Sequence, residues 1–245
     1  MRDPRFQMNQ NHSYWVNDLF AAGARDWTPA SARHAARVLY APLSPDPEAS
    51  RRCASVLSNT ELRRTGLFLT EDGKAQFQQR RAFRRYCGAY VLGSSRPLTQ
   101  IDFQETEKGR PYLPDLPDVW FSFSSCRFGF LGAWSSTHGV GIDIEDHTQN
   151  LETTELAERF FSQPEAKAVE GTCPRTFFHL WTLKEAALKS IGEGLPMGLD
   201  EFQFELTSNL CVVRAPRDHG DPERFSAHLM HGTASCAALV ICSAD

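Results

Sequence analysis

The alternation of side chains over residues 140–145 (VGIDIE) is the feature that most constrains this chain, because three β-branched residues alternate with a glycine and two acids. Strand side chains alternate between the two faces, so Asp143 and Glu145 project from one face while the β-branched residues on the other face enter the core. Their Cα atoms lie about 6.8 Å apart at the usual strand rise. Two carboxylates this close repel each other unless a cation lies between them. Oxygen ligands suit a hard ion such as Mg²⁺. The alternative is a half-exposed strand that ends in two solvated acids.

A second informative stretch predicts a helix over residues 176–191 (TFFHLWTLKEAALKSI), with Gly192 directly after its end. Trp181, Glu185 and Lys189 follow one another at i, i+4 and i+8 and therefore share a face, which Lys184 flanks. Lysines and a carboxylate beside an indole are typical of a phosphate and metal site at the edge of a core. An ordinary amphipathic helix with a Glu185–Lys189 surface pair is the alternative interpretation.

Together these stretches resemble the two main signatures of the 4′-phosphopantetheinyl transferases, in the broad-acceptor class that modifies carrier proteins of peptide, polyketide and siderophore synthases. The signatures are G-[IV]-D-[IVL]-E and W-x-x-K-E-[AS]-x-x-K, about forty residues apart. They appear here as GIDIE at 141–145 and WTLKEAALK at 181–189. RFF at 159–161, HLW at 179–181 and the stretch 192–206 continue the similarity. Both signatures in this order form a specific pattern, and the resemblance covers at least residues 55 to 206.

The resemblance implies an α+β fold of two pseudo-symmetric halves, each with helices packed on a small antiparallel sheet. It places the boundary near Ser136–Gly139. The N-terminal half, residues 1–138, then carries the coenzyme A-binding helix and strands. The C-terminal half, residues 139–245, carries the metal and catalytic motifs.

The implied reaction transfers 4′-phosphopantetheine from coenzyme A to a serine of an apo acyl or peptidyl carrier protein. Asp143, Glu145 and Glu185 then hold Mg²⁺ against the pyrophosphate. Glu185, directly or through a metal-bound water, also helps to take the serine proton. Lys189 neutralises charge on the leaving adenosine 3′,5′-bisphosphate, and Lys184 assists. Attack falls on the β-phosphorus, so no covalent enzyme intermediate forms.

Further coenzyme A contacts are implied on other elements. Arg81, in the segment QRRAFRR at 79–85, matches a family arginine that binds the 3′-phosphate, and Arg110 lies in a loop similar to the family's G-K-P loop. The strand FSFSSC at 121–126 matches F-N-x-S-H-S, which assigns Ser124 and Ser125 to coenzyme A. Serine replaces the usual asparagine at Ser122 and the usual histidine at Ser125. A hydroxyl still donates one hydrogen bond, but it carries no charge.

Composition restricts the partners and the compartment. The net charge of −4 argues against a general nucleic-acid binder. The start of the chain shows no signal-peptide pattern, and no run reaches the roughly 18 apolar residues of a membrane span. Seven cysteines without a C-x-x-C pair are typical of reduced thiols. We therefore expect a cytoplasmic monomer with no membrane or nucleic-acid partner.

The pattern along the chain predicts the remaining elements. Ser58 opens a helix through about Phe68 with a capping box, after a Pro- and Asp-rich loop over 41–50. The other predicted helices are 73–92, ended by Gly93, and 152–161. The predicted strands are 119–125, 128–136, 139–145, 201–206, 210–214, 224–230 and 234–242.

Two other functions stay open. A homologue that binds coenzyme A or a carrier protein without catalysis would explain Ser122 and Ser125. A metal-dependent nucleotide hydrolase would explain the acids, but not the spacing of the two signatures.

Overall fold

Two antiparallel sheets form the middle of the molecule, which a computed structural model describes over residues 24–93, 96–193, 197–207 and 210–243. The first sheet contains, in order, β1 (Arg25–Asp26), β2 (Arg37–Pro42), β6 (Gly129–Ser135) and β5 (Trp120–Cys126). The second contains, in order, β10 (Phe225–His231), β11 (Ser235–Ser243) and β7 (His138–Asp146). Two short hairpins pair β3 (Gln104–Glu105) with β4 (Pro111–Tyr112) and β8 (Gln203–Glu205) with β9 (Cys211–Arg214).

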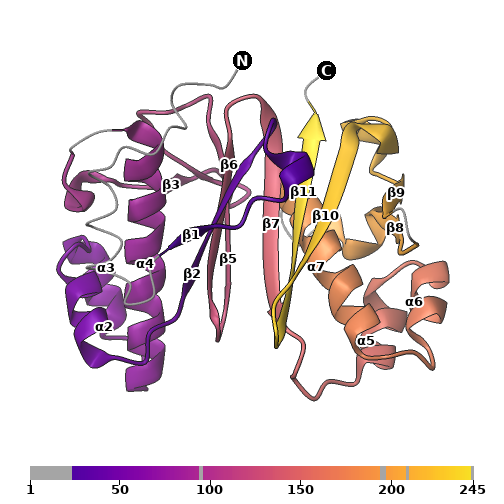
Figure 1. Ribbon diagram of the computed structural model, residues 1–245, viewed down its shortest axis with the longest axis horizontal. Helices are drawn as coiled ribbons and strands as arrows, with labels where there is room; N and C mark the ends of the chain where they lie inside the picture. Colours follow the sequence, from indigo (N-terminus) through magenta and orange to yellow (C-terminus); the bar gives the residue numbers. More distant parts are fainter. Residues whose placement is uncertain (1–23, 94–95, 194–196, 208–209, 244–245) are drawn as a thin grey trace.

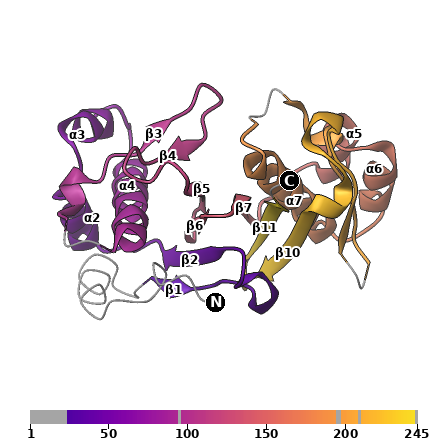
Figure 2. The same ribbon diagram turned by 90° about the horizontal axis from the view of Figure 1, so that it is seen from above.

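Helices flank the strands on both sides (Figure 1). On one side lie α2 (Pro47–Ala54), α3 (Asn59–Thr65) and α4 (Glu71–Leu92), and on the other lie α5 (Thr153–Phe160), α6 (Gln163–Val169) and α7 (Arg175–Ser190). Viewed from above, the strands separate the two groups, with β1 and β2 at one edge and the β3–β4 hairpin at the other (Figure 2). The chain therefore has an α+β fold, as expected from its sequence.

Three hydrophobic clusters hold these layers together. One lies under α4 and includes Phe83 and Trp134, and a second surrounds α7 and includes Phe177 and Phe202. The third joins the two sheets, because residues of β2 and β6 pack in it against the β-branched face of β7 and against β11. Packing in this shared cluster fixes how the two sheets lie relative to each other.

The order of the strands follows the chain. Every strand of the first sheet lies before residue 136, and every strand of the second begins at His138 or later. Strands β5 and β7 are neighbours, but each pairs through its backbone only within its own sheet. The division into halves 1–138 and 139–245 stays a prediction, and strand β7 of the second sheet begins at His138, the last residue of the first proposed half.

Local signals in the sequence explain several helix ends. Ser58 and Glu61 form the capping box at the start of α3, and Gly93 ends α4 with a φ of 60°, a left-handed value that suits glycine. Helix α3 ends at Thr65 rather than near Phe68. The predicted loop over 41–50 is wrong in part, because Asp46 caps helix α2 and Pro47 is its first residue.

Two further findings concern the chain as a whole. None of the seven cysteines, all of which lie in the described ranges, forms a disulfide, in agreement with reduced thiols. Among the described residues, no helix is both long and apolar enough to cross a membrane. Residues 194–196, within the family-like stretch 192–206, lie outside the described residues.

Candidate active site

Close packing of helix α7 on strand β7 creates the site. Gly139 and Gly141 share the face of β7 that bears Asp143, and a Cβ atom at Gly141 would overlap the carbonyl oxygen of Ala186. A Cβ atom at Gly139 would likewise overlap the carbonyl oxygen of Ser190. Glycine at these positions lets the helix lie directly on the strand. The charged groups of the two motifs are thereby brought together.

Lys189 and Asp143 form the centre of this cluster. The Nζ atom of Lys189 donates to Oδ1 of Asp143 at 2.7 Å and lies 3.9 Å from Oε2 of Glu185. Asp143 is buried and Lys189 is partly exposed. The hydroxyl of Ser124 also donates to Oδ1 of Asp143, at 2.7 Å. The structure thus joins Asp143, Glu185 and Lys189, which the sequence separates by up to 46 positions.

The electrostatics of the cluster favour a bound cation. Burial, with repulsion from Asp143 and Glu185, raises the pKa of Glu145 to about 7, although Lys189 opposes the shift. Burial and Asp143 also raise the pKa of Glu185, again against Lys189. Three carboxylates near one ammonium leave an excess of negative charge, which a divalent cation would neutralise.

The fit of Mg²⁺ rests on Asp143. Its Oδ2 atom is buried and has no hydrogen-bond partner within the described residues, which is the state of an oxygen ready to bind an ion. Nowhere in the described ranges do three or more His, Cys, Asp or Glu side chains already group as metal ligands. Mg²⁺ does not require such a cage, because it takes one or two carboxylates and completes its shell with phosphates and water. Asp143, Glu145 and Glu185 therefore suit Mg²⁺ by donor type.

Two clefts open beside the cluster. The carboxylate cleft has a volume of about 310 Å³, and its walls include Arg84, Arg110, Phe123, Glu185 and Lys189. The arginine cleft has a volume of about 260 Å³, and its walls include Arg80, Arg84, Phe123, Ser124 and Ser125. Arg84 and Phe123 line both clefts, so the two adjoin. Cationic and hydroxyl side chains beside the carboxylates form a surface suited to an extended polyanion.

Comparison with known proteins identifies the family of the chain. The model of the 4′-phosphopantetheinyl transferase superfamily matches residues 139–239. A putative 4′-phosphopantetheinyl transferase of Synechocystis sp. is 30% identical over 179 residues, which is 70% of this chain and 70% of the relative. The chain belongs to this superfamily.

Two bacterial relatives are more similar over shorter stretches. A 4′-phosphopantetheinyl transferase of Bacillus subtilis is 34% identical over 145 residues, or 56% of this chain and 63% of the relative. The 4′-phosphopantetheinyl transferase Sfp of Bacillus subtilis strain 168 is 37% identical over 126 residues, or 49% of this chain and 55% of the relative. The chain thus spans little more than half of the length of these two transferases.

Some of the coenzyme A contacts expected for a phosphopantetheinyl transferase line the two clefts. Ser124 and Ser125 line the arginine cleft, and Arg110 and Lys189 line the carboxylate cleft. The guanidinium of Arg110 lies over the ring of Trp120, 4.2 Å from its centroid, and partial burial lowers the pKa of Arg110. These four residues are therefore exposed to the two clefts, and their contacts with coenzyme A stay a prediction.

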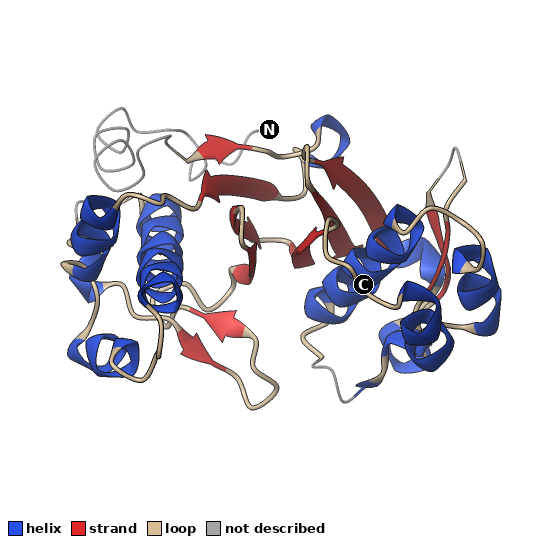
Figure 3. Cartoon of the chain, turned by 90° about the horizontal axis from the view of Figure 1, so that it is seen from below, coloured by secondary structure: helices blue, strands red, loops and turns tan. Residues whose placement is uncertain are grey.

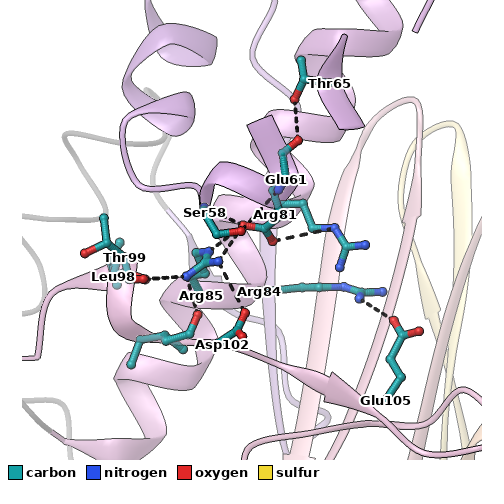
Figure 4. A network of polar contacts seen from close by, with 11 residues as sticks. Ser58, Glu61, Thr65, Arg81, Arg84, Arg85, Leu98, Thr99, Asp102 and Glu105 are labelled. Carbon is teal, nitrogen blue, oxygen red and sulfur yellow. Dashed lines mark hydrogen bonds and ion pairs between the residues drawn. The ribbon is translucent and has the colours of Figure 1, made fainter. Parts of the chain in front are cut away.

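Arg81 is not among the residues that line these two clefts, and its assignment to coenzyme A stays a prediction. Figure 4 shows Arg81 beside Glu61. Its Nε atom lies 3.9 Å from Glu61, the carboxylate that also accepts from Arg85 at 2.6 Å. Arg81 and Arg85 are four residues apart and share one face of α4, whereas Arg80 and Arg84 share the face at the cleft. The charged residues of the arginine cleft are therefore Arg80 and Arg84.

The structure places Lys184 away from both clefts, because its side chain is fully buried in the core. It forms an ion pair with Glu165 at 2.7 Å and donates to the carbonyl oxygens of Leu199 and Phe202. None of these partners is among the residues that line the carboxylate cleft. Lys184 cannot contact coenzyme A in this position and instead anchors the helix.

Sequence reasoning gave no role to two parts of the site. Arg84 is held with its Nε atom buried and without a hydrogen-bond partner among the described residues, and burial beside Arg81 and Arg80 lowers its pKa to about 10. Lys108 in the β3–β4 hairpin forms an ion pair with Glu193, just after α7, and both residues line the carboxylate cleft. The hairpin lies at the edge of the molecule opposite β1 and β2 (Figure 3). The four-residue spacing of Arg80 and Arg84 was the signal in the sequence that could have placed these two arginines on one face of the helix. No local signal joined Lys108 to Glu193.

Proposed function

We propose that this protein transfers the 4′-phosphopantetheine group of coenzyme A to a serine of an apo acyl or peptidyl carrier protein. The observation that carries the proposal is the junction of β7 and α7, where Asp143, Glu185 and Lys189 meet beside an arginine-lined cleft. A carboxylate cluster next to a polyanion site suits attack on a pyrophosphate. Membership of the superfamily points to the same reaction.

The step balances without a covalent enzyme intermediate. The hydroxyl oxygen of the acceptor serine bonds to the β-phosphorus of coenzyme A, and the bond from that phosphorus to the bridging oxygen breaks. Glu185 takes the serine proton. Lys189 stabilises the charge on the bridging oxygen, which leaves with adenosine 3′,5′-bisphosphate.

The proposal includes a requirement for Mg²⁺, held by Asp143, Glu145 and Glu185. A bound Mg²⁺ polarises phosphoryl oxygens and offsets the negative charge that would repel the nucleophile. Without it, the excess negative charge of the three carboxylates would oppose binding of the pyrophosphate.

Coenzyme A would lie across both clefts. Its pyrophosphate would lie near Lys189 and Arg110, and its 3′-phosphate near Arg80, Arg84 and Ser125. The guanidinium groups suit a phosphate because they donate two parallel hydrogen bonds. Two arginines in this position would supply the positive charge that Ser125 lacks.

The setting of the reaction is proposed from the sequence. We infer that the protein acts in the cytoplasm as a monomer and serves carrier proteins of secondary-metabolite synthases. Nucleic acid and membranes are not partners in this proposal.

Mass spectrometry tests the function directly. The protein is mixed with coenzyme A, Mg²⁺ and an apo carrier protein, and the mass of the carrier is measured. A gain equal to one phosphopantetheine group, lost when EDTA replaces Mg²⁺, supports the proposal. An unmodified carrier with coenzyme A retained on the protein would indicate a binding homologue, and cleaved coenzyme A with an unmodified carrier would indicate a hydrolase.

A further inference from the structure

Two serines of β5 bridge the gap between the sheets. Ser122 and Ser124 lie two positions apart and so share a face of the strand. The hydroxyl of Ser122 accepts a hydrogen bond from the backbone N–H of Ile142 at 3.0 Å. The hydroxyl of Ser124 donates to Oδ1 of Asp143 at 2.7 Å. These side chains connect β5 to β7 at the point where no backbone ladder joins them.

The two oxygens of Asp143 therefore have different surroundings. Oδ1 accepts from both Ser124 and Lys189, each at 2.7 Å. Oδ2 is buried and accepts nothing from the described residues. A carboxylate rotates easily about its terminal bond, but the two donors to Oδ1 restrict this rotation in Asp143. The orientation of Oδ2 is consequently fixed.

Ser124 cannot serve this role and donate to a phosphate at the same time. A hydroxyl has one proton to give, and Ser124 gives it to Asp143. Phosphate oxygens at neutral pH are acceptors, so they would compete for that proton rather than add to the contact. Ser125 lines the same cleft from the next position along the strand and has a hydroxyl of its own.

We propose that Ser124 is a positioning residue that holds Oδ1 of Asp143 and thereby presents Oδ2 to a divalent cation. This inference rests on the proposed function, because that function requires the cation. It differs from the sequence expectation, which assigned Ser124 to coenzyme A. Removal of a residue that hydrogen-bonds to a metal ligand typically weakens metal binding by about 10- to 100-fold.

The test compares Ser124→Ala with Ser124→Thr, which keeps the hydroxyl, and with Ser125→Ala on the same strand. Mn²⁺ binding is measured by water-proton relaxation, both for the protein alone and with coenzyme A after subtraction of a protein-free blank. Coenzyme A binding is measured separately by calorimetry in EDTA. Melting temperatures confirm that each variant is folded.

We expect Ser124→Ala to weaken Mn²⁺ binding by about 10-fold and to change metal-free coenzyme A affinity by less than about twofold. Ser124→Thr should retain the Mn²⁺ affinity. Ser125→Ala should retain it as well, and should weaken coenzyme A binding. Unchanged Mn²⁺ affinity in Ser124→Ala, or a loss of metal-free coenzyme A affinity in that variant, would overturn the inference.

The carrier assay separates this inference from the function. Transfer by the wild-type protein together with unchanged Mn²⁺ affinity in Ser124→Ala overturns only the role of Ser124. Loss of Mn²⁺ affinity in Ser124→Ala without transfer by the wild type overturns the function and supports the role. A wild-type protein that binds no Mn²⁺ under either condition overturns the metal site and the inference together.

Discussion

Lys184 and Glu165 form a buried ion pair 2.7 Å long, although Lys184 is next in the chain to Glu185, which lines the carboxylate cleft. Adjacent residues of a helix point about 100° apart, so one motif supplies both a core anchor and the proposed catalytic group Glu185. Glu165 also accepts from the hydroxyl of Ser162 and from the backbone N–H of Phe204. The pair thus ties α7 to α6 and β8.

We expect Lys184→Met to lower the free energy of unfolding by about 3–5 kcal/mol, because it leaves the carboxylate of Glu165 buried without its cation. The KM for coenzyme A should stay near the wild-type value in the protein that remains folded. Lys189→Met is the matched variant on the cleft side: it should abolish transfer, and it should also lower stability, because buried Asp143 loses its cation. Urea unfolding and steady-state kinetics measure both. A raised KM with normal stability in Lys184→Met would return this lysine to the cleft.

The contact of Gly141 with Ala186 gives a second prediction. Gly141→Ala forces α7 away from β7, because the added Cβ atom would overlap backbone atoms that cannot rotate aside. We expect a loss of at least about 1–3 kcal/mol in stability and a large fall in kcat. Gly66→Ala is the control, since Gly66 is exposed, has a φ of −65° and meets only the carbonyl oxygen of Arg63 at 3.3 Å. Normal activity in Gly141→Ala would show that this close approach is not required.

Much of the fold was predictable because its signals are local. The capping box at Ser58, the glycine after Leu92 and the alternation around Ile142 each act through neighbouring residues, and the structure confirms the elements they predicted. Helix α2 was missed because Pro47 was treated as a loop residue rather than as the first residue of a helix. Helix α6 was missed although Ser162 and Glu165 form a capping box.

The site was harder to predict because it depends on contacts between distant elements. Spacing correctly placed Asp143 and Lys189 on facing surfaces, since each belongs to a regular element of known period. The roles of Arg81 and Lys184 could not be decided by spacing, because they depend on where Glu61 and Glu165 lie in the fold. Such partners lie 19 or 20 residues away in sequence, and periodicity carries no information about them.

The raised pKa of Glu145 gives a prediction for the stability of the metal-free protein. The folded state holds the proton up to a pKa of about 7, whereas an ordinary glutamate releases it near 4.5. Between pH 4.5 and pH 7 the folded state therefore binds more protons at Glu145 than the unfolded state does. The protonated Glu145 contributes its full stabilisation below pH 4.5, and this stabilisation is lost as the pH rises through 7. In EDTA, the free energy of unfolding should fall less over pH 5 to 8 in Glu145→Gln than in the wild type. Burial lowers the pKa of His179 to about 4, and this shift makes stability rise with pH, opposite to the effect of Glu145. The test is therefore the difference in slope between Glu145→Gln and the wild type, since both contain His179. Equal slopes would mean that Glu145 titrates normally.

The arginines of α4 give a prediction about substrate affinity. Arg80→Ala and Arg84→Ala should each raise the KM for coenzyme A by about 10-fold or more, since each removes charged hydrogen bonds to phosphate. Arg81→Ala should change this KM by less than about twofold, because Arg81 faces Glu61. Kinetics with 3′-dephospho-coenzyme A test the position of the phosphate. If the arginines bind the 3′-phosphate, their removal should affect coenzyme A far more than the dephosphorylated analogue. An equal effect on both substrates would place them at the pyrophosphate instead.

The replacement of a family histidine by Ser125 leads to the last prediction. Ser125 lines the arginine cleft together with Arg80 and Arg84, so the phosphate there already meets two positive charges. Ser125→His adds a third charge when the imidazole is protonated, and a charge-assisted hydrogen bond replaces a neutral one at a gain on the order of 1 kcal/mol. The KM for coenzyme A should fall several-fold at pH 6 and less at pH 8, where the imidazole is neutral. The nearby arginines oppose protonation in the free protein, whereas a bound phosphate favours it, so the benefit should be larger for coenzyme A than for 3′-dephospho-coenzyme A. An unchanged KM across this pH range would show that position 125 does not contact the phosphate and that the arginines alone bind it.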